Sequence, residues 1–123
     1  RFRENRRPLP GLALTDPAAL TAAANDFGWE QAFARPVLAL AGPGDAVVCL
    51  STSGESEAVL EAARAALDVG ALLVALTGAG PNTLAGLARH AVRVPSRDTA
   101  RVQEAHLLIG HLWAEMIEDG SGK

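Results

Sequence analysis

The sequence predicts an α/β fold with a parallel sheet covered by helices on both faces. Short apolar runs, such as residues 46–50 and 71–76, alternate with helical segments of about ten to fifteen residues. This alternation is typical of βαβ units, whose strands run parallel and whose crossover helices pack on the sheet. The 123 residues suffice for one domain with one core, and the sequence has no internal repeat or dividing linker.

The expected elements can be placed in order along the chain. Residues 1–10 are charged and proline-rich, which favours irregular structure. Strands are predicted at residues 12–14, 46–50, 71–76 and 91–94. Helices are predicted at residues 17–24, 29–40, 57–69, from residue 81 or 83 to about 89, and at 101–118.

Capping residues and turns support these boundaries. Asp16 and Pro17 suit the N-cap and first position of a helix, and Gly70 suits the position after a helix ends. Residues 25–28 are expected to break the first helix, and residues 42–45 to form a turn. The last helix has three N-cap candidates, which are Ser96, Asp98 and Thr99.

Apolar side chains recur at helical spacing. One face of the helix at residues 29–40 carries Phe33, Val37 and Leu40. One face of the helix at residues 57–69 carries Val59, Leu60, Ala63 and Leu67. The last helix is apolar around more than one face, which predicts that it is buried on much of its surface. Because so small a domain struggles to bury all of these residues, we expect a homo-oligomer; the residues are Leu107, Leu108, Leu112, Trp113, Met116 and Ile117.

Composition excludes several classes of function. The formal net charge of −3 argues against nucleic acid as a partner, and no apolar run reaches membrane-spanning length. The basic cluster Arg1, Arg3, Arg6 and Arg7 is interpreted as a solvated or anion-contacting N-terminal segment. The single cysteine, Cys49, lies in a predicted buried strand and is expected to be an inert core thiol, which fits a reducing cytoplasm.

The stretch from Ser51 to Ser56 lies where a strand turns into a helix. A helix start offers unpaired N–H groups and the positive end of the helix dipole, which suit an anion. The hydroxyls of Ser51, Thr52, Ser53 and Ser56 can add donors, and Gly54 lets the backbone come close. Two interpretations stay open, a phosphate cradle built from hydroxyls or an ordinary serine-rich helix cap.

The remaining polar candidates are ambiguous. His90 is expected to end a helix and to be structural, whereas His106 and His111 on the last helix are either hydrogen-bonded core residues or bases. Gln103 and Glu104 lie in the first turns of that helix. Asn25 and Asp26 interrupt two helices, where loop residues are often functional, although this pair is also common turn chemistry. No Cys/His cluster has the spacing of metal ligands.

Several stretches together resemble the SIS (sugar isomerase) family, and within it the phosphoheptose isomerases. The matching stretches occur in family order and cover nearly the whole chain. They are residues 1–6 (RFRENR), 24–28 (ANDFG), 51–56 (STSGES), 76–78 (LTG), 94–96 (VPS) and 99–106 (TARVQEAH). The serine-rich loop is shared by many SIS proteins, whereas the Asn-Asp and Arg-x-Gln-Glu-x-His elements are much narrower.

The resemblance implies a cytoplasmic ketose–aldose isomerase that converts sedoheptulose 7-phosphate to glycero-manno-heptose 7-phosphate for surface-polysaccharide synthesis. It implies that Ser51, Thr52, Ser53 and Ser56 hold the phosphate and that Asn25, Asp26 and Gln103 contact the sugar. It also implies that His111 is the catalytic acid/base, that Gln103 and His111 are zinc ligands, and that the protein is a tetramer. The alternative is a non-catalytic SIS module that binds a sugar phosphate, or a regulator like the DnaA initiator-associating proteins.

The resemblance also implies a three-layer αβα fold with a five-stranded parallel sheet in the flavodoxin-like order 2-1-3-4-5. Residues 12–14, 46–50, 71–76 and 91–94 are candidates for strands two to five. The first strand, and a helix carrying a catalytic glutamate and a histidine ligand, would precede Arg1. We therefore expect an N-terminal extension, and a gap between residues 12–14 and 46–50 of about twice the 4.8 Å strand spacing.

Overall fold

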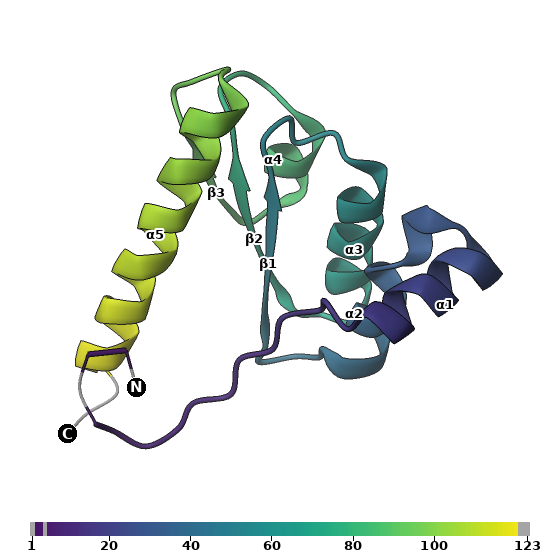
Figure 1. The fold of residues 1–123 in the computed structure, drawn as a ribbon, viewed down its shortest axis with the longest axis horizontal. Helices are drawn as coiled ribbons and strands as arrows, with labels where there is room; N and C mark the ends of the chain where they lie inside the picture. Colours follow the sequence, from purple (N-terminus) through teal and green to yellow (C-terminus); the bar gives the residue numbers. More distant parts are fainter. Residues whose placement is uncertain (1, 4, 121–123) are drawn as a thin grey trace.

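The computed structural model describes residues 2, 3 and 5–120 and has the expected α/β architecture (Figure 1). Within these residues, one parallel sheet has the order β1 (Ala46–Ser51), β2 (Leu72–Thr77) and β3 (His90–Arg93). The helical elements are α1 (Pro17–Phe27), the 3-10 turn η1 (Trp29–Gln31), α2 (Ala34–Leu40), α3 (Glu57–Asp68), α4 (Thr83–Leu87) and α5 (Thr99–Gly120).

The parallel strands all end at one edge of the sheet. Ser51, the last residue of β1, pairs with Thr77 of β2, and Thr77 pairs in turn with Arg93 of β3. The loops that lead into α3, α4 and α5 therefore leave the sheet side by side. Ligands of open α/β sheets bind outside this carboxyl edge, so it is the part of the fold where a site is expected.

The core lies between the sheet and one layer of helices. α3 and α4 pack on this face of the sheet, and α2 packs against α3. Small residues of α3, such as Ala63 and Ala66, are completely buried and let the helix approach the strands closely. Leu73 and Leu84 fill the layer between them, and each fully buried leucine stabilises the fold by about 2 kcal/mol.

The opposite face of the sheet is covered only in part. α5 lies on this side but diverges from the sheet beyond its first turns (Figure 1), and its buried residues are Val102 and His106. Val48 and Leu50 of β1 are 43% and 51% exposed. The expectations of a buried strand at residues 46–50 and of a last helix buried on much of its surface are therefore wrong in part, whereas the expected α/β fold with a parallel sheet is confirmed.

The strand expected at residues 12–14 does not form. This segment is irregular, the N–H of Thr15 turns back to the carbonyl of Ala13 at 2.9 Å, and β1 pairs only with β2 among the described residues. A groove of about 850 Å³ lies between the segment and β1, lined by both. The physical reason is that a strand needs a neighbour for its backbone groups, and among the described residues no strand pairs with this segment.

The helix that was expected at residues 29–40 is interrupted at residues 32–33, and Pro36 lies in the first turn of the part that follows. Without an N–H group, Pro36 cannot bond to the carbonyl of Ala32, so the segment becomes η1 followed by α2. Val37 is buried and Phe33 half-buried as expected, but Leu40 is exposed. Leu67, expected on the buried face of α3, is also exposed.

Two other boundaries differ from expectation. α1 continues through Asn25 and Asp26 to Phe27, and Gly28 stops it with a φ of 92°, a value that glycine adopts readily and other residues rarely do. His90 begins β3 rather than ending a helix, because the backbone is already extended at Ala88. The predicted N-cap positions at Asp16 and Asp98 are confirmed, since their carboxylates accept first-turn N–H groups at 2.8 and 2.9 Å.

The N-terminal segment lies along the last turns of α5. The backbone N–H groups of Phe2 and Arg3 donate to the carboxylate of Glu118 at 2.8 and 2.7 Å, and Arg6 Nε lies 3.4 Å from the same carboxylate. Arg3 also pairs with Glu115. Part of the basic cluster is thus paired with carboxylates, while Arg1 lies outside the described residues.

None of the described helices has the length and apolarity needed to cross a membrane.

Candidate functional site

Backbone hydrogen bonds join the three loops at the carboxyl edge of the sheet. The N–H of Gly78, after β2, donates to the carbonyl of Thr52, after β1, at 3.1 Å. The N–H of Ala79 donates to the carbonyl of Ser96, after β3, at 3.0 Å. A Cβ at Gly78 would lie 2.6 Å from the Thr52 oxygen, so only glycine permits this approach. The loop after β1 therefore rests on a defined support.

Hydroxyls organise the loop after β1, residues 51–56. Ser51 Oγ accepts a hydrogen bond from the N–H of Gly54 at 3.0 Å, and Ser53 Oγ accepts one from the N–H of Glu55 at 3.2 Å. The two hydroxyl oxygens lie 3.4 Å apart. A hydroxyl that accepts an N–H still has its own hydrogen to donate, so when one of these two hydroxyls bonds to the other, the second keeps a hydrogen for a phosphate oxygen.

Ser56 distinguishes the two interpretations of this loop. It is the N-cap of α3, yet its side chain makes no capping hydrogen bond. Asp16 and Asn82 do cap α1 and α4, because their side-chain oxygens accept first-turn N–H groups. Among the described residues, no backbone N–H of α3 is capped by the Ser56 hydroxyl, which is exposed and therefore free to bind a ligand at the start of α3. This arrangement favours the phosphate cradle over the ordinary cap.

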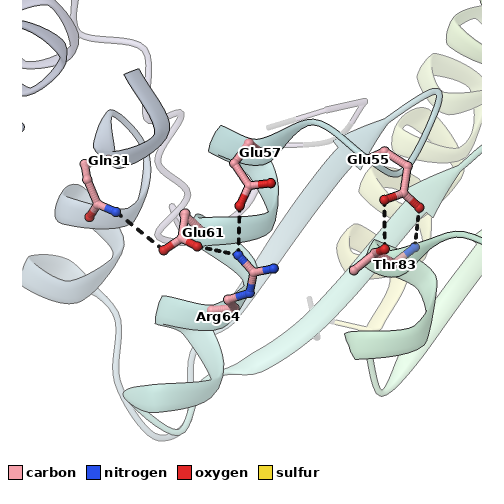
Figure 2. Close-up of polar contacts among 6 residues, drawn as sticks. All are labelled: Gln31, Glu55, Glu57, Glu61, Arg64 and Thr83. Carbon is pink, nitrogen blue, oxygen red and sulfur yellow. Dashed lines mark hydrogen bonds and ion pairs between the residues drawn. The ribbon is translucent and has the colours of Figure 1, made fainter. Parts of the chain in front are cut away.

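Two residues at this edge, Glu55 and Thr83, were not predicted from the sequence to contact each other. Glu55 accepts two hydrogen bonds from Thr83, one from its backbone N–H and one from its hydroxyl, at 2.7 and 2.8 Å (Figure 2). The Pro-Asn-Thr stretch at residues 81–83 is a recognisable helix start, but no local signal shows that Glu55, 28 residues earlier, would reach it.

α5 holds its four polar candidates in different surroundings. Gln103 and Glu104 are exposed in the first turns, and Glu104 pairs with Arg101. His106 is buried, with Nε2 3.3 Å from the carbonyl oxygen of Thr77, so it is the hydrogen-bonded core histidine that one of the two interpretations expected. His111 is exposed, and its ring centroid lies 5.7 Å from that of Phe2. Eight helical residues rise about 12 Å, so Gln103 and His111 lie more than two turns apart.

Asn25 and Asp26 are not brought to the serine-rich loop. They lie in the last turn of α1, where Asn25 Nδ2 donates to Asp26 Oδ1 at 2.8 Å. α1 packs against η1 and lies away from the carboxyl edge of the sheet (Figure 1). Their predicted contact with a sugar therefore stays a prediction.

The residues present do not assemble a zinc site. Among the residues that the structure describes, no three His, Cys, Asp or Glu side chains gather into a group that could hold a metal. Gln103 and His111 alone fall short of the four donors that zinc takes. Cys49 is no thiolate ligand either, because burial raises the pKa of its thiol to about 11.

The chain is similar to known sugar-phosphate enzymes. The family model of the SIS domain matches residues 1–78. A phosphoheptose isomerase from Aquifex aeolicus is 44% identical over 120 residues, which are 97% of this chain and 63% of that protein. One from Solidesulfovibrio magneticus is 50% identical over 119 residues, or 96% of this chain and 58% of that protein.

Solved structures agree with these relatives. The structure of a phosphoheptose isomerase from Francisella tularensis matches 93% of this chain with a TM-score of 0.89 and 39% identity. One from Neisseria gonorrhoeae matches 88% with a TM-score of 0.85, again at 39% identity. This chain covers 62% and 61% of those two chains, so it spans less than two thirds of the proteins that it matches.

Proposed function

The chain belongs to the SIS domain family, and from this premise we propose that it is a ketose–aldose isomerase of sugar phosphates. The proposed reaction converts sedoheptulose 7-phosphate to D-glycero-D-manno-heptose 7-phosphate, in the cytoplasm, for surface-polysaccharide synthesis. The observation that carries the proposal is the 44–50% identity, over nearly the whole chain, to proteins named phosphoheptose isomerase.

In this proposal the phosphate of the sugar binds the loop after β1. Ser51, Thr52, Ser53 and Ser56 donate hydroxyl hydrogens, and the N–H groups at the start of α3 add the positive end of the helix dipole. The support for this binding mode is the free hydroxyl of Ser56 and the position of the loop at the carboxyl edge of the sheet.

Isomerisation moves a proton between two carbons of the bound sugar. A base removes a proton from C1 of the ketose, which leaves an enediol across C1 and C2. A proton then returns to C2, while the hydroxyl proton passes from O1 to O2, so that an aldose results with no net gain or loss. We assign the acid/base role to His111, because histidine exchanges protons readily near neutral pH, and we assign a hydrogen bond with the sugar to Gln103.

The test is turnover of sedoheptulose 7-phosphate by the intact protein, followed by NMR. His111→Asn is expected to lower kcat by about 100-fold or more, while sugar-phosphate binding is kept. His90→Asn is the matched control, since His90 is also an exposed histidine, on β3 and outside the proposed site. Full activity of His111→Asn would contradict the assigned role.

The non-catalytic SIS module predicts a different outcome of the same experiment. The observation that favours it is that, among the described residues, no three His, Cys, Asp or Glu side chains gather into one group. Binding of sedoheptulose 7-phosphate without any turnover by the intact protein would replace the isomerase by this module, or by a regulator of the DnaA initiator-associating type.

We also propose that a second copy of the chain covers the exposed apolar side chains of α5, within a tetramer. Exposed apolar residues gathered in this way, rather than scattered singly, are typical of an interaction surface; the residues are Leu107, Leu108, Leu112, Met116 and Ile117. Zinc would need donors beyond Gln103 and His111, so no step of the proposed reaction depends on it.

A further proposal concerns the free edge of β1. Its backbone groups lack a partner on the side away from β2, among the described residues, and an apolar groove lined by Leu12, Leu14 and Leu50 runs beside it. We propose that the first strand of the five-stranded SIS order, from a segment before Arg1, pairs here. A structure of a longer natural protein with no strand paired to Ala46–Ser51 on this side would contradict the proposal.

A further inference from the structure

A carboxylate from the loop after β1 holds the start of α4. Glu55 Oε1 accepts the N–H of Thr83 at 2.7 Å, and Glu55 Oε2 accepts the Thr83 hydroxyl at 2.8 Å (Figure 2). Both are charge-assisted hydrogen bonds, the stronger class. They lower the pKa of the Glu55 carboxyl, the backbone N–H having the larger effect, so the carboxylate remains charged and an acceptor near neutral pH.

Neighbouring contacts fasten the same two segments together. The carbonyl of Gly54 accepts the N–H of Leu84 at 3.1 Å, and Gly54 lies directly against the side chain of Asn82. Asn82 Oδ1 caps the N–H of Ala85 at 2.9 Å, and its Nδ2 lies 3.2 Å from the hydroxyl of buried Thr77. Glu55 is thus the exposed, charged member of a contact whose other members are neutral.

We propose that Glu55 is a positioning residue of the phosphate loop, which it fixes against α4 through Thr83. The inference rests on the proposed function and deepens it. Ser53 Oγ is bonded to the N–H of Glu55 itself, and Ser56 follows Glu55 directly in the chain. A shift of Glu55 therefore displaces both hydroxyls, and the phosphate of the substrate loses two aligned donors.

The contact also resolves an electrostatic conflict. A carboxylate within an anion-binding loop repels the anion unless its charge is engaged elsewhere, and both oxygens of Glu55 are engaged by Thr83. The same bonds, with Asn82, consume the N–H groups of Thr83 and Ala85 at the start of α4. Of these two helix starts, that of α3, where the Ser56 side chain makes no capping hydrogen bond, is the one available to the phosphate.

The decisive comparison is Glu55→Ala against Glu55→Gln, with binding of sedoheptulose 7-phosphate and of inorganic phosphate measured by calorimetry. Both variants remove a negative charge, which by itself strengthens anion binding. The Gln amide can still accept the N–H of Thr83 and donate to its hydroxyl. We expect Glu55→Gln to bind within about twofold of the wild type and Glu55→Ala to bind about tenfold more weakly.

Two further variants test the same contact from other positions. Thr83→Ala keeps the backbone N–H but loses the hydroxyl, so it should weaken binding by about threefold, and less than additively with Glu55→Ala. Glu57→Ala is the matched control, because Glu57 is an exposed carboxylate two residues on that pairs with Arg64 at 3.1 Å instead (Figure 2). It should not weaken phosphate binding.

Three results would overturn the proposal. The first is a Glu55→Ala protein that binds the sugar phosphate as tightly as Glu57→Ala does, and the second is a Glu55→Gln protein whose affinity falls as far as that of Glu55→Ala. The third is a Glu55→Ala protein whose KM is unchanged while only its kcat falls. If Glu55→Ala does not fold, Thr83→Ala and Glu55→Gln carry the comparison. Failure of the proposed function looks different, since the wild type itself would then neither bind nor convert the sugar phosphate. In that case the Thr83 amide NMR shift would still follow the titration of Glu55 in the ligand-free protein.

Discussion

Gly54 lies so close to Asn82 that a Cβ at residue 54 would come within 2.2 Å of Asn82 Oδ1. Gly54 also has a φ of 71°, a backbone conformation that residues other than glycine rarely adopt. Asn82 cannot easily move aside, because its amide is bonded to Ala85 and Thr77. The turn of the phosphate loop and the start of α4 therefore fit together only with glycine at this position.

Gly54→Ala should consequently destabilise the protein more than backbone strain alone. We expect a loss of about 2–4 kcal/mol in the free energy of unfolding, measured with urea, from the left-handed backbone plus the contact with Asn82. Gly80→Ala is the control, because Gly80 has a φ of 94° but open space around it, and should cost only about 1–2 kcal/mol. Equal losses would show that Asn82 gives way.

Ser56→Ala should weaken ligand binding without weakening the fold. An N-cap serine is usually worth about 1 kcal/mol, but Ser56 makes no capping hydrogen bond, so we expect its loss to change stability by less than about 0.5 kcal/mol. Affinity for a sugar phosphate should fall by about 1–2 kcal/mol, and Ser53→Ala should act similarly. Asp16→Ala, which removes a formed cap, is the stability control. A Ser56→Ala protein that melts early but binds normally would restore the structural-cap interpretation.

Leu112→Glu should dissociate the proposed oligomer. Leu112 is 48% exposed among the apolar side chains of α5. In the proposed assembly the second copy would bury a carboxylate at this position, and burying an unpaired charge is costly. Light scattering at micromolar concentration should show an assembly for the intact wild type and a smaller species for the variant. Leu67→Glu, at a similarly exposed leucine on α3, should leave the assembly intact. A wild type that is monomeric at this concentration would remove the proposal.

Stability should fall with rising pH between 9 and 11 because of Cys49. Burial raises the pKa of its thiol from 9.0 to about 11, so in this range the unfolded chain releases the proton while the folded chain keeps it. The free energy of unfolding should then drop by up to about 2–3 kcal/mol by pH 11. The effect is readable because the chain has no tyrosine and a single lysine, Lys123. Cys49→Ala should flatten this dependence, and an unchanged slope in that variant would assign it to another group.

Local signals predicted much of the fold. The strands that became β1 and β2, and the helix that became α3, follow from apolar periodicity, and the caps at Asp16 and Asp98 follow from bonds within a few residues. The serine-rich stretch at residues 51–56 was also placed correctly between a strand and a helix, and its binding of a phosphate stays a prediction. The capping bonds are closed within three residues and so depend little on the rest of the chain, whereas apolar periodicity shows which segments can be buried without showing against what.

Contacts between distant segments could not be predicted in this way. Glu55 and Thr83 meet only because parallel strands end at one edge and bring their loops together. The sequence does not distinguish His106 from His111, because both lie on the same apolar helix. His106 is buried against Thr77 and His111 is exposed, because α5 diverges from the sheet after its first turns (Figure 1). Val48 is exposed, and residues 12–14 form no strand, for a related reason: burial and backbone pairing require a second surface, and only the tertiary arrangement determines whether one is there.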